Sequence, residues 1–451
     1  MPLFERLAPL ALLGLFALTP AAEAAGTKTS SPSYGLPEET GLLPRASMPE
    51  GGVEHGWSNH GTTPEAAAPP AVPGKDNMPE GSADRPLRND PTPTNSDEGR
   101  PTPPHIDLPL GIVPQVAGRQ LHLQFQGYMR MIAALVENDA LPFIGRNDGF
   151  RLADIRLGVK ASYGEDIFAY VSIDGALAQS TDPNDPNAQL AVGLRDAYMA
   201  FVLSPLASIR LGRFKAPYDL GDLEPTGERV FIDAPVESRG VVATEGIQVT
   251  GLAVDRQLGL MIHTDKMGLT KDGFDLGYAL AITNGKTEDR VLNDNDHFAG
   301  FARLMFHFGK WVTLNGAGFI DSRTTGTLPN LLDDQVLGVE GSAVIHIENL
   351  RVEGQFLLQH VTPQTAQTGE YNGFGWHAGW SYRIWGFEPA YRFAYFEPND
   401  RVEQDIVMEH TLALSYYFEK FPLRLSVNGT FAAEQRKLDN NRLAFLAQFS
   451  F

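Results

Sequence analysis

The sequence predicts an all-β chain: a transmembrane antiparallel β-barrel of about sixteen strands behind a disordered, Pro-rich linker. Three observations lead to this prediction. Short stretches of alternating apolar and polar residues recur from about residue 117 onward. Alternation at this period places the two kinds of side chain on opposite faces of a strand. The connections between the stretches are short and long in turn, and the chain ends in an aromatic strand at Phe451.

Residues 1–25 are predicted to be a signal peptide. An apolar run from Leu7 to Leu18 precedes Ala22-Glu23-Ala24, a small-x-small cleavage site. The run is too short to cross a bilayer, and no later segment approaches the about 18 apolar residues of a membrane helix. The chain has no Cys, which excludes disulfides and thiolate metal sites. The protein is therefore expected to leave the cytoplasm.

Residues 26–115 are predicted to be a disordered linker. The segment is rich in Pro, Gly, Ser and Thr and includes Pro101-Thr102-Pro103-Pro104. Between Gly26 and His105 it holds eleven Asp and Glu against six Lys and Arg. A segment with so few large apolar residues buries too little surface to offset its ordering entropy. Most of the formal net charge of −19 therefore belongs to the folded part.

The predicted barrel covers residues 116–451, where amphipathic strands follow one another. Such strands suit a wall with lipid on one side and water on the other. Aromatic residues, whose polar tips suit a membrane interface, gather on two successive strands. Examples of the alternation are Leu121, Leu123 and Phe125 against His122, Gln124 and Gln126, and Leu423, Leu425 and Val427 against Arg424, Ser426 and Asn428. The aromatic positions are Phe374, Trp376, Trp380, Tyr382, Phe387, Tyr391, Phe393 and Tyr395.

The strand count follows from the connections. Seventeen stretches qualify, and merging Glu245–Val249 with Leu258–Ile262 into one bulged strand gives sixteen. Bacterial barrels have even numbers, so 14 and 18 stay open. The short turns are Tyr163–Asp166, Ser204–Ala207, Gly309-Lys310, Glu348-Asn349, Trp385-Gly386 and Glu419-Lys420. The long connections include Leu135–Gly149, Gly175–Gly193, Ala216–Val242 and Asp321–Asp334.

The C-terminal strand points to the outer membrane of a Gram-negative bacterium. Leu443, Phe445, Phe449 and Phe451 share one face of it. This ending resembles the aromatic signal by which the outer-membrane assembly machinery recognises its substrates, so Phe449 and Phe451 are candidate assembly residues. Outer-membrane lipids and that machinery are the expected partners. The alternative is the edge strand of a secreted β-sandwich, which needs no alternation of short and long connections.

From Leu194 onward the chain resembles the phosphate-selective porin O and P family. The resemblance implies a sixteen-stranded, homotrimeric porin whose third external loop folds inward. It also implies passive diffusion of small hydrophilic solutes and ions, with a preference for anions or phosphate left open. The stretches that carry it are Leu194-Arg195-Asp196-Ala197-Tyr198, Leu211-Gly212-Arg213-Phe214-Lys215-Ala216-Pro217-Tyr218, the loop from Arg229 to Arg239, and Ile282-Thr283-Asn284-Gly285.

Basic residues in and beside the longest connection are the candidate pore and anion-binding residues. Arg suits the bidentate geometry of oxyanions. Six acidic residues share the same loop, so loop ion pairs are an equal alternative to an anion site. The pore candidates are Arg213, Lys215, Arg229 and Arg239. Alternation further predicts an Arg-weighted lumen wall of Arg130, Arg156, Arg351, Arg392 and Arg424, which favours weak anion preference.

Signs of other chemistry are weak. The eleven His form no His-Glu-x-x-His pair, no Gly-x-Ser-x-Gly elbow occurs, and no basic aromatic surface suggests nucleic acid. We therefore expect no enzyme activity, no cofactor and no metal. The acidic turns 182–185 and 293–296 offer oxygen ligands for Ca²⁺ but lack a closing Glu, so plain loops are favoured. Two rival functions remain, a barrel enzyme of the lipid-hydrolase type and a non-conducting structural or adhesive barrel.

Overall fold

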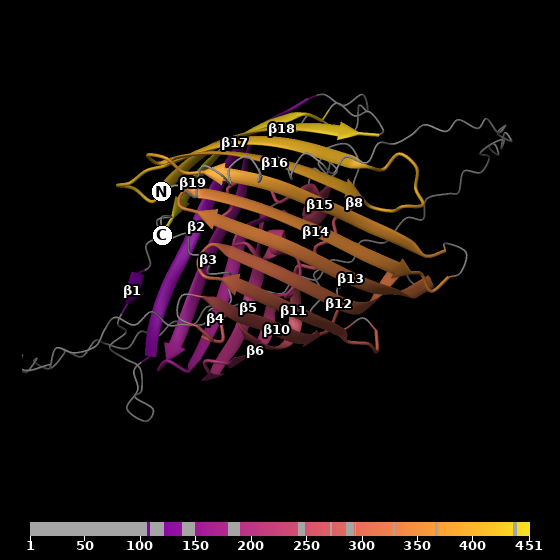
Figure 1. Ribbon diagram of the computed structural model, residues 1–451, viewed down its shortest axis with the longest axis horizontal. Coiled ribbons are helices and arrows are strands. Elements are labelled where there is room, and N and C mark those ends of the chain that lie inside the picture. The colour runs from indigo at the N-terminus through magenta and orange to yellow at the C-terminus, as the bar shows by residue number, and fades with distance from the viewer. Residues whose placement is uncertain are drawn as a thin grey trace, which may run out of the picture. The chain divides into compact units, whose positions relative to one another are not determined.

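The computed structural model describes residues 106–108, 121–137, 149–178, 190–241, 249–270, 273–285, 293, 295–327, 330–365, 369–435 and 440–451. Sixteen strands form the wall of an antiparallel barrel (Figure 1). They are β2 (Leu121–Val136), β3 (Gly149–Tyr163), β4 (Ile167–Ala178), β5 (Leu190–Ser204), β6 (Ala207–Lys215), β9 (Arg256–Thr264), β10 (Phe274–Thr283), β11 (Ala299–Phe308), β12 (Val312–Thr327), β13 (Asn330–Ile347), β14 (Leu350–Thr362), β15 (Tyr371–Tyr382), β16 (Phe387–Glu397), β17 (Val407–Tyr417), β18 (Leu423–Glu434) and β19 (Arg442–Ser450).

The sheet closes on itself. Each strand pairs with its neighbour along the chain, β6 pairs with β9, and the last strand, β19, pairs with the first, β2. A closed ring leaves no unpaired strand edge in lipid, which is the condition for crossing a membrane with strands. The predicted fold class and the number sixteen are confirmed. No helix in the described part of the chain is long and apolar enough to span a membrane.

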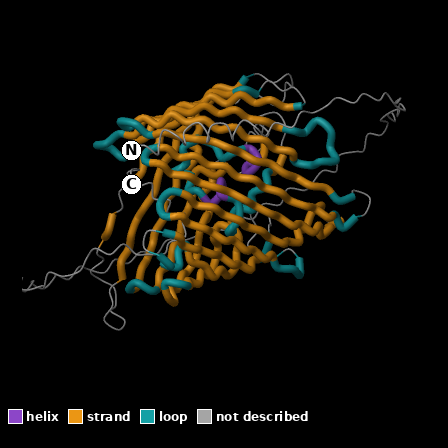
Figure 2. Tube along the Cα trace, viewed as in Figure 1, coloured by secondary structure: helices purple, strands orange, loops and turns teal. Residues whose placement is uncertain are grey.

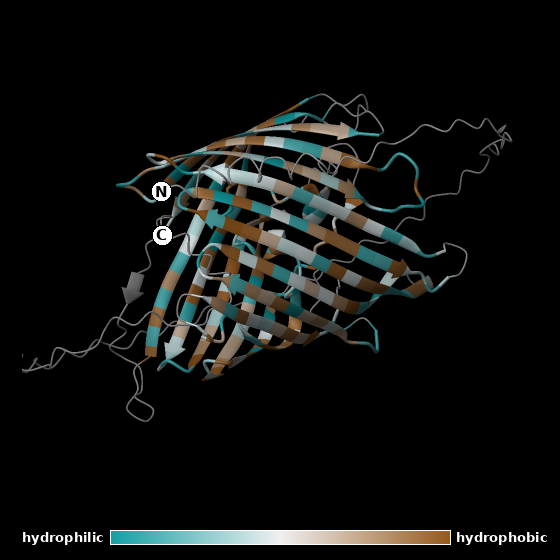
Figure 3. Cartoon of the chain, viewed as in Figure 1, coloured by the Kyte–Doolittle hydropathy of each residue, from teal (hydrophilic) through white to brown (hydrophobic). Residues whose placement is uncertain are grey.

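The two faces of the strands differ as predicted. Leu412 and Leu414 on β17 are 55% and 44% exposed, whereas Thr411 and Ser415, on the other face, are buried. Figure 3 shows hydrophobic and hydrophilic positions alternating along the strands in the same way. The exposed apolar side therefore faces outward, as a barrel wall in lipid requires. The aromatic positions Trp376, Trp380 and Phe387 lie on this outer face.

The connections divide between the two ends of the barrel. All six predicted short turns join strands at the predicted places, and a seventh connection at the same end runs over 265–273. The opposite end carries the longest connection, residues 216–255 between β6 and β9. The prediction of a long connection at Asp321–Asp334 is wrong, because β12 and β13 continue as a ladder up to Thr327 and Asn330. The alternation of apolar and polar residues ends before the strand pairing does. A hairpin that extends beyond the lipid needs no apolar face.

The predicted bulged strand is also wrong. Val249–Thr250 forms β8, which pairs with β7 (Gly240–Val241) in a separate two-stranded sheet, and the barrel strand begins only at Arg256. The change of parity between the two stretches arises because the chain leaves one sheet and enters another. Most of Glu245–Val249 lies outside the described residues.

A short strand, β1 (Ile106–Leu108), extends the seam of the barrel. Phe451 exchanges two main-chain hydrogen bonds with Gly127 of β2, and β1 pairs with Leu123–Phe125 just beyond that point. This strand therefore covers an edge of β2 that β19 is too short to reach. It falls within the segment 26–115, whose remaining residues, like the predicted signal peptide 1–25, lie outside the described residues.

Candidate functional site

The connection 216–255 is hereafter the inner loop, and its described residues, 216–241 and 249–255, fold into the barrel. It contains two short helices, α2 (Leu220–Leu223) and α3 (Val236–Arg239), which lie within the ring of strands in Figure 2. The loop residues Tyr218, Asp219 and Val236 are at most 1% exposed. A sixteen-stranded barrel is wide enough to hold such a loop in its lumen. The loop is longer than the predicted Ala216–Val242, because the chain rejoins the wall only at Arg256.

One part of the inner loop packs on an apolar patch of the inner wall. The ring of Tyr218 lies edge-on against Phe319 of β12, with centroids 4.8 Å apart, and Phe319 stacks on Phe301 of β11. The Tyr218 hydroxyl donates to the main-chain oxygen of Val339 at 3.2 Å. Sequence reasoning missed this patch. The signal was available, because β11 and β12 carry apolar residues on both faces, which a wall facing only water does not need.

A second part of the loop meets β15 through buried polar groups. The Glu237 carboxylate lies 2.5 Å from Nδ1 of His377, and the two side chains are 0% and 3% exposed. Oδ1 of Asp219 accepts hydrogen bonds from Gln355 at 2.8 Å and from Ser238 at 3.0 Å. Burial, together with the nearby charge of Asp222, raises the pKa of the Asp219 carboxyl to about 7. The loop is therefore bound to the wall by specific polar contacts as well as by apolar packing.

All five predicted wall arginines have partners on the inner side of the barrel. Three of them, Arg130, Arg392 and Arg424, donate to main-chain oxygens of the inner loop. Arg351 forms ion pairs with Glu224 of the loop at 2.8 Å and with Glu353 of its own strand at 2.6 Å. Arg156 lies 3.3 Å from Asp174 and 3.9 Å from Asp154, both on neighbouring wall positions. The ion pair of Arg351 with Glu224 thus joins the wall to the loop, whereas the predicted pairs lay within the loop itself.

Two of the four pore candidates meet the first turn of the inner loop. Lys215, at the end of β6, donates to the main-chain oxygens of Asp222 and Glu224. Arg229 donates to the main-chain oxygen of Gly221 at 2.7 Å. Both side chains therefore hold α2 from outside the helix. Lys215 also lies 3.9 Å from the carboxylate of Asp222.

The other two candidates lie apart from this place. Arg239 pairs with Glu409 of β17 at 2.6 Å, and Arg442 of β19 reaches the same carboxylate at 3.0 Å. Arg213 follows Leu211 on the outward parity of β6 and pairs in register with Leu258. The backbone between them is distorted at Gly212, which has a φ of 130°. The structure does not bring the four predicted residues into one cluster.

Two basic residues near the loop were not predicted as site residues. Arg256 begins β9 and binds Asp196 at 2.9 Å. Arg195 lies 3.6 Å from Asp174, and a register shift between β4 and β5 at this point leaves Arg195 as the extra residue of a β-bulge. The bulge lets Arg195 and Asp196 both face inward. Arg256 was missed because the merged strand hid the start of β9.

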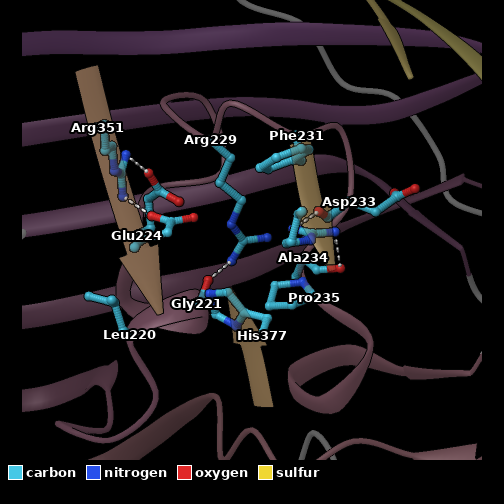
Figure 4. Close-up of a pocket in the computed structure, with 12 residues that line it drawn as sticks. Leu220, Gly221, Glu224, Arg229, Phe231, Asp233, Ala234, Pro235, Arg351 and His377 are labelled. Carbon is cyan, nitrogen blue, oxygen red and sulfur yellow. Dashed lines mark hydrogen bonds and ion pairs between the residues drawn. The ribbon is translucent and has the colours of Figure 1, made fainter. Parts of the chain in front are cut away.

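A small cleft separates the inner loop from the wall of β14 to β16 (Figure 4). About 340 Å³ of space, part of it open to solvent, lies between the lining residues. Arg229 and Phe231 lie on the loop side, and Arg351, His377 and Arg392 on the wall side. Glu224 and Glu353 add negative charge beside Arg351. Such a mixed lining suits water and small ions better than an apolar solute.

Among the residues that the structure describes, no three His, Cys, Asp or Glu side chains form a group that could hold a metal ion. Of the acidic turns, 182–185 lies outside the described residues. In the other turn, Oδ1 of Asn293 accepts from the main chain of Asn295, whose own amide donates to the main-chain oxygen of Ser322. These are the bonds of an ordinary Asn-stabilised turn.

Comparisons with known proteins agree with this architecture. A family model described as phosphate-selective porin O and P matches residues 136–449, well over half of the chain. A search of curated protein sequences finds no match. Among solved structures, similar folds include the outer membrane channel DcaP of Acinetobacter baumannii (12% identity, 73% of this chain and 97% of that chain, TM-score 0.52). A second is an anion-selective porin from Comamonas acidovorans (13% identity, 74% of this chain and 100% of that chain, TM-score 0.50). A third is OmpF of Salmonella typhi in complex with daunomycin (13% identity, 74% of this chain and 98% of that chain, TM-score 0.51). At such identities the likeness shows the fold alone.

Proposed function

The chain belongs to the phosphate-selective porin O and P family, and from that premise we propose that its lumen passes small hydrophilic solutes and ions with a weak preference for anions. The protein is an outer-membrane porin of a Gram-negative bacterium. The proposal concerns anions as a class and does not include a phosphate site. A phosphate site is left out because the arginines of the barrel wall already bind carbonyl oxygens and carboxylates of the inner loop and the wall.

The surroundings of two loop carboxylates carry the proposal of anion preference. Burial alone would raise the pKa of the Asp233 carboxyl, but four arginines, Arg442 acting most strongly, hold it below its usual range. Burial would also raise the pKa of the Asp255 carboxyl. Arg256, Lys215 and two further arginines nevertheless hold this pKa below its usual range. Several basic groups thus act on each carboxylate, although Arg239 and Arg442 also pair with Glu409, and Arg256 with Asp196. An excess of positive charge favours anions most strongly where a passage is narrow and partly desolvated.

Acidic groups elsewhere in the loop limit this preference. Glu237 and Glu224 pair with His377 and Arg351 of the wall. Asp219 accepts hydrogen bonds from the uncharged side chains of Gln355 and Ser238 and lies near Asp222. The balance of charge is therefore positive only locally, which is why we propose weak selectivity and not a strict anion channel.

The zero-current potential across a planar bilayer with a KCl gradient tests the proposal. The protein purified in detergent should conduct, and the sign of the potential should indicate that chloride is more permeant than potassium. A potential of the opposite sign would overturn the anion preference. Absence of conductance in folded protein would favour the structural or adhesive barrel instead.

We also propose that the protein is not an enzyme and that it assembles as a homotrimer. Family membership supports both parts. Hydrolysis of phospholipid by the purified barrel, absent from a detergent blank, would contradict the first. Native mass spectrometry of the detergent-solubilised protein should give three copies, and a monomer under gentle extraction would contradict the second. Outer-membrane lipids and the assembly machinery remain the expected partners.

A further inference from the structure

We propose that three arginines of the barrel wall, Arg130, Arg392 and Arg424, are positioning residues that clamp the inner loop by its main chain. The inference rests on the proposed function, in which the inner loop narrows the lumen. It assigns these residues a task other than binding a permeating anion. Their task is to keep one stretch of the loop, residues 229–234, fixed against the wall.

The clamp consists of four hydrogen bonds from three strands to one stretch of loop. Strands β2, β16 and β18 supply the donors, and β17 and β19 lie among them in the wall. The three arginines are only 3–4% exposed. In order along the loop, Arg424 Nη1 donates to Arg229 O at 2.6 Å, Arg130 Nη2 to Ile232 O at 2.6 Å, Arg392 Nη1 to Asp233 O at 3.1 Å, and Arg392 Nη2 to Ala234 O at 3.3 Å.

Each guanidinium group also has a partner on a second side, and for Arg130 and Arg424 that partner lies outside the clamped stretch. One is held by a carboxylate and two by aromatic rings, and a planar cation suits both kinds of partner. Arg130 Nη1 lies 2.8 Å from Asp154, Arg392 lies 4.5 Å above the ring of Phe231, and Arg424 lies 5.8 Å from the ring centre of Tyr417.

The loop needs such donors because this stretch has no regular structure of its own. Residues 229–234 lie between α2 and α3, outside any helix or strand. Val230, Phe231 and Ile232 are nevertheless buried. A buried carbonyl group without a donor is costly, so the removal of a clamp residue should release the stretch from the wall.

Arg392 offers the sharpest test, because its two terminal nitrogens reach two adjacent carbonyl groups. A Lys at this position keeps the positive charge but cannot reproduce the planar fork. Arg156 is the matched control. It also faces inward, but its ion pairs are with Asp154 and Asp174 of the wall.

The experiment follows loop mobility with a spin label. The chain has no Cys, so Glu228→Cys, an exposed position next to the clamped stretch, gives a unique labelling site. In the labelled full-length barrel, Arg392→Lys and Arg392→Gln should both convert the spectrum from an immobile to a mobile component. Arg156→Lys and Arg156→Gln should leave it unchanged. Arg130→Gln and Arg424→Gln test the same claim at two independent positions, with heat-modifiable gel mobility reporting folding.

Two results would overturn the clamp. One is a spectrum of Arg392→Lys that equals the wild type, which would mean that charge and not the fork is what matters. The other is an immobile label in all the folded Gln variants. The spin label measures loop mobility and needs no current through the barrel. The test of the clamp is therefore independent of the test of anion preference. If the barrel shows no anion preference, the spectra still test whether the arginines hold the loop.

Discussion

Gly375 on β15 faces Glu237 of the inner loop so closely that a Cβ on Gly375 would lie 2.3 Å from the Glu237 Cβ. No side chain fits at this distance without movement of the backbone. The contact places α3 directly against the wall and brings the Glu237 carboxylate to His377, two residues along the same strand. A missing side chain on the wall is thus what allows the loop to approach so closely.

Replacing this glycine should push the loop away from the wall. Gly375→Ala is expected to destabilise the barrel by about 1–3 kcal/mol, the usual range for overpacking. Urea unfolding, followed by tryptophan fluorescence, measures the change. Gly341→Ala on β13 is the control, because a Cβ there has no other atom within 4 Å. Equal stability of the two variants would show that the close contact does not hold.

Removing one partner of the Glu237–His377 pair should also be costly. Glu237→Leu leaves a buried His without its carboxylate, and the loss of one member of a buried pair is typically about 3–5 kcal/mol. His377→Leu should cost a similar amount. The double variant should regain much of the loss, because no unpaired polar group remains. Additive losses in a double-mutant cycle of unfolding free energies would exclude a direct interaction.

Asp219 predicts how the stability of the barrel changes with pH. Its pKa rises from an ordinary value of 3.8 to about 7, so the folded state holds its proton more tightly than the unfolded state. This contribution to stability is complete below pH 3.8 and is lost as the pH rises to about 7, each pKa unit being worth about 1.4 kcal/mol. Asp219→Asn removes the buried charge and keeps Oδ1 as acceptor. The thermal midpoint of this variant should exceed that of the wild type at pH 8 and differ less at pH 5. A constant difference at both pH values would contradict the assignment.

The sequence predicted the wall of the barrel well because the wall obeys a local rule. Lipid on one side and water on the other force alternation in every strand, as in Leu412 and Leu414 against Thr411 and Ser415. Connection lengths then fix the strand number, although β8 was wrongly merged into the wall. The error did not change the number of barrel strands, because β8 lies in a separate sheet and is not a strand of the barrel.

The contents of the lumen could not be predicted in the same way. Glu237 and His377 are 140 residues apart in the chain, and no local pattern shows that they meet. The inward positions of Phe301 and Phe319 depend on where Tyr218 packs, which alternation alone does not encode. The predicted wall arginines were found on the inner side, but three of them bind carbonyl groups of a distant loop, which carry no sequence signal at all.

Assembly should depend on the contact of Phe451 with Gly127. Phe451 exchanges main-chain hydrogen bonds of 2.8 and 2.9 Å with Gly127, and its ring covers that glycine so closely that a Cβ there would lie 2.5 Å from it. Phe451→Asp places a charge in this contact and should sharply lower the amount of protein in the outer membrane. Ser450→Asp, which adds the same charge one position earlier on the other face, is the control. Immunoblots of outer-membrane fractions measure both, and equal amounts would argue against a special role of the terminal aromatic residue.

In the proposed function, basic residues around the inner loop give the lumen its anion preference. The most direct measurement is the zero-current potential at low salt, where screening is weak. Lys215→Gln, Arg229→Gln and Arg239→Gln combined remove three positive charges from the loop and its base. Lys310→Gln, Arg401→Gln and Lys420→Gln combined remove the same charge from exposed turns. We expect the first variant to lose anion preference and the second to keep the wild-type potential. Equal potentials in the wild type and the first variant would contradict the claim.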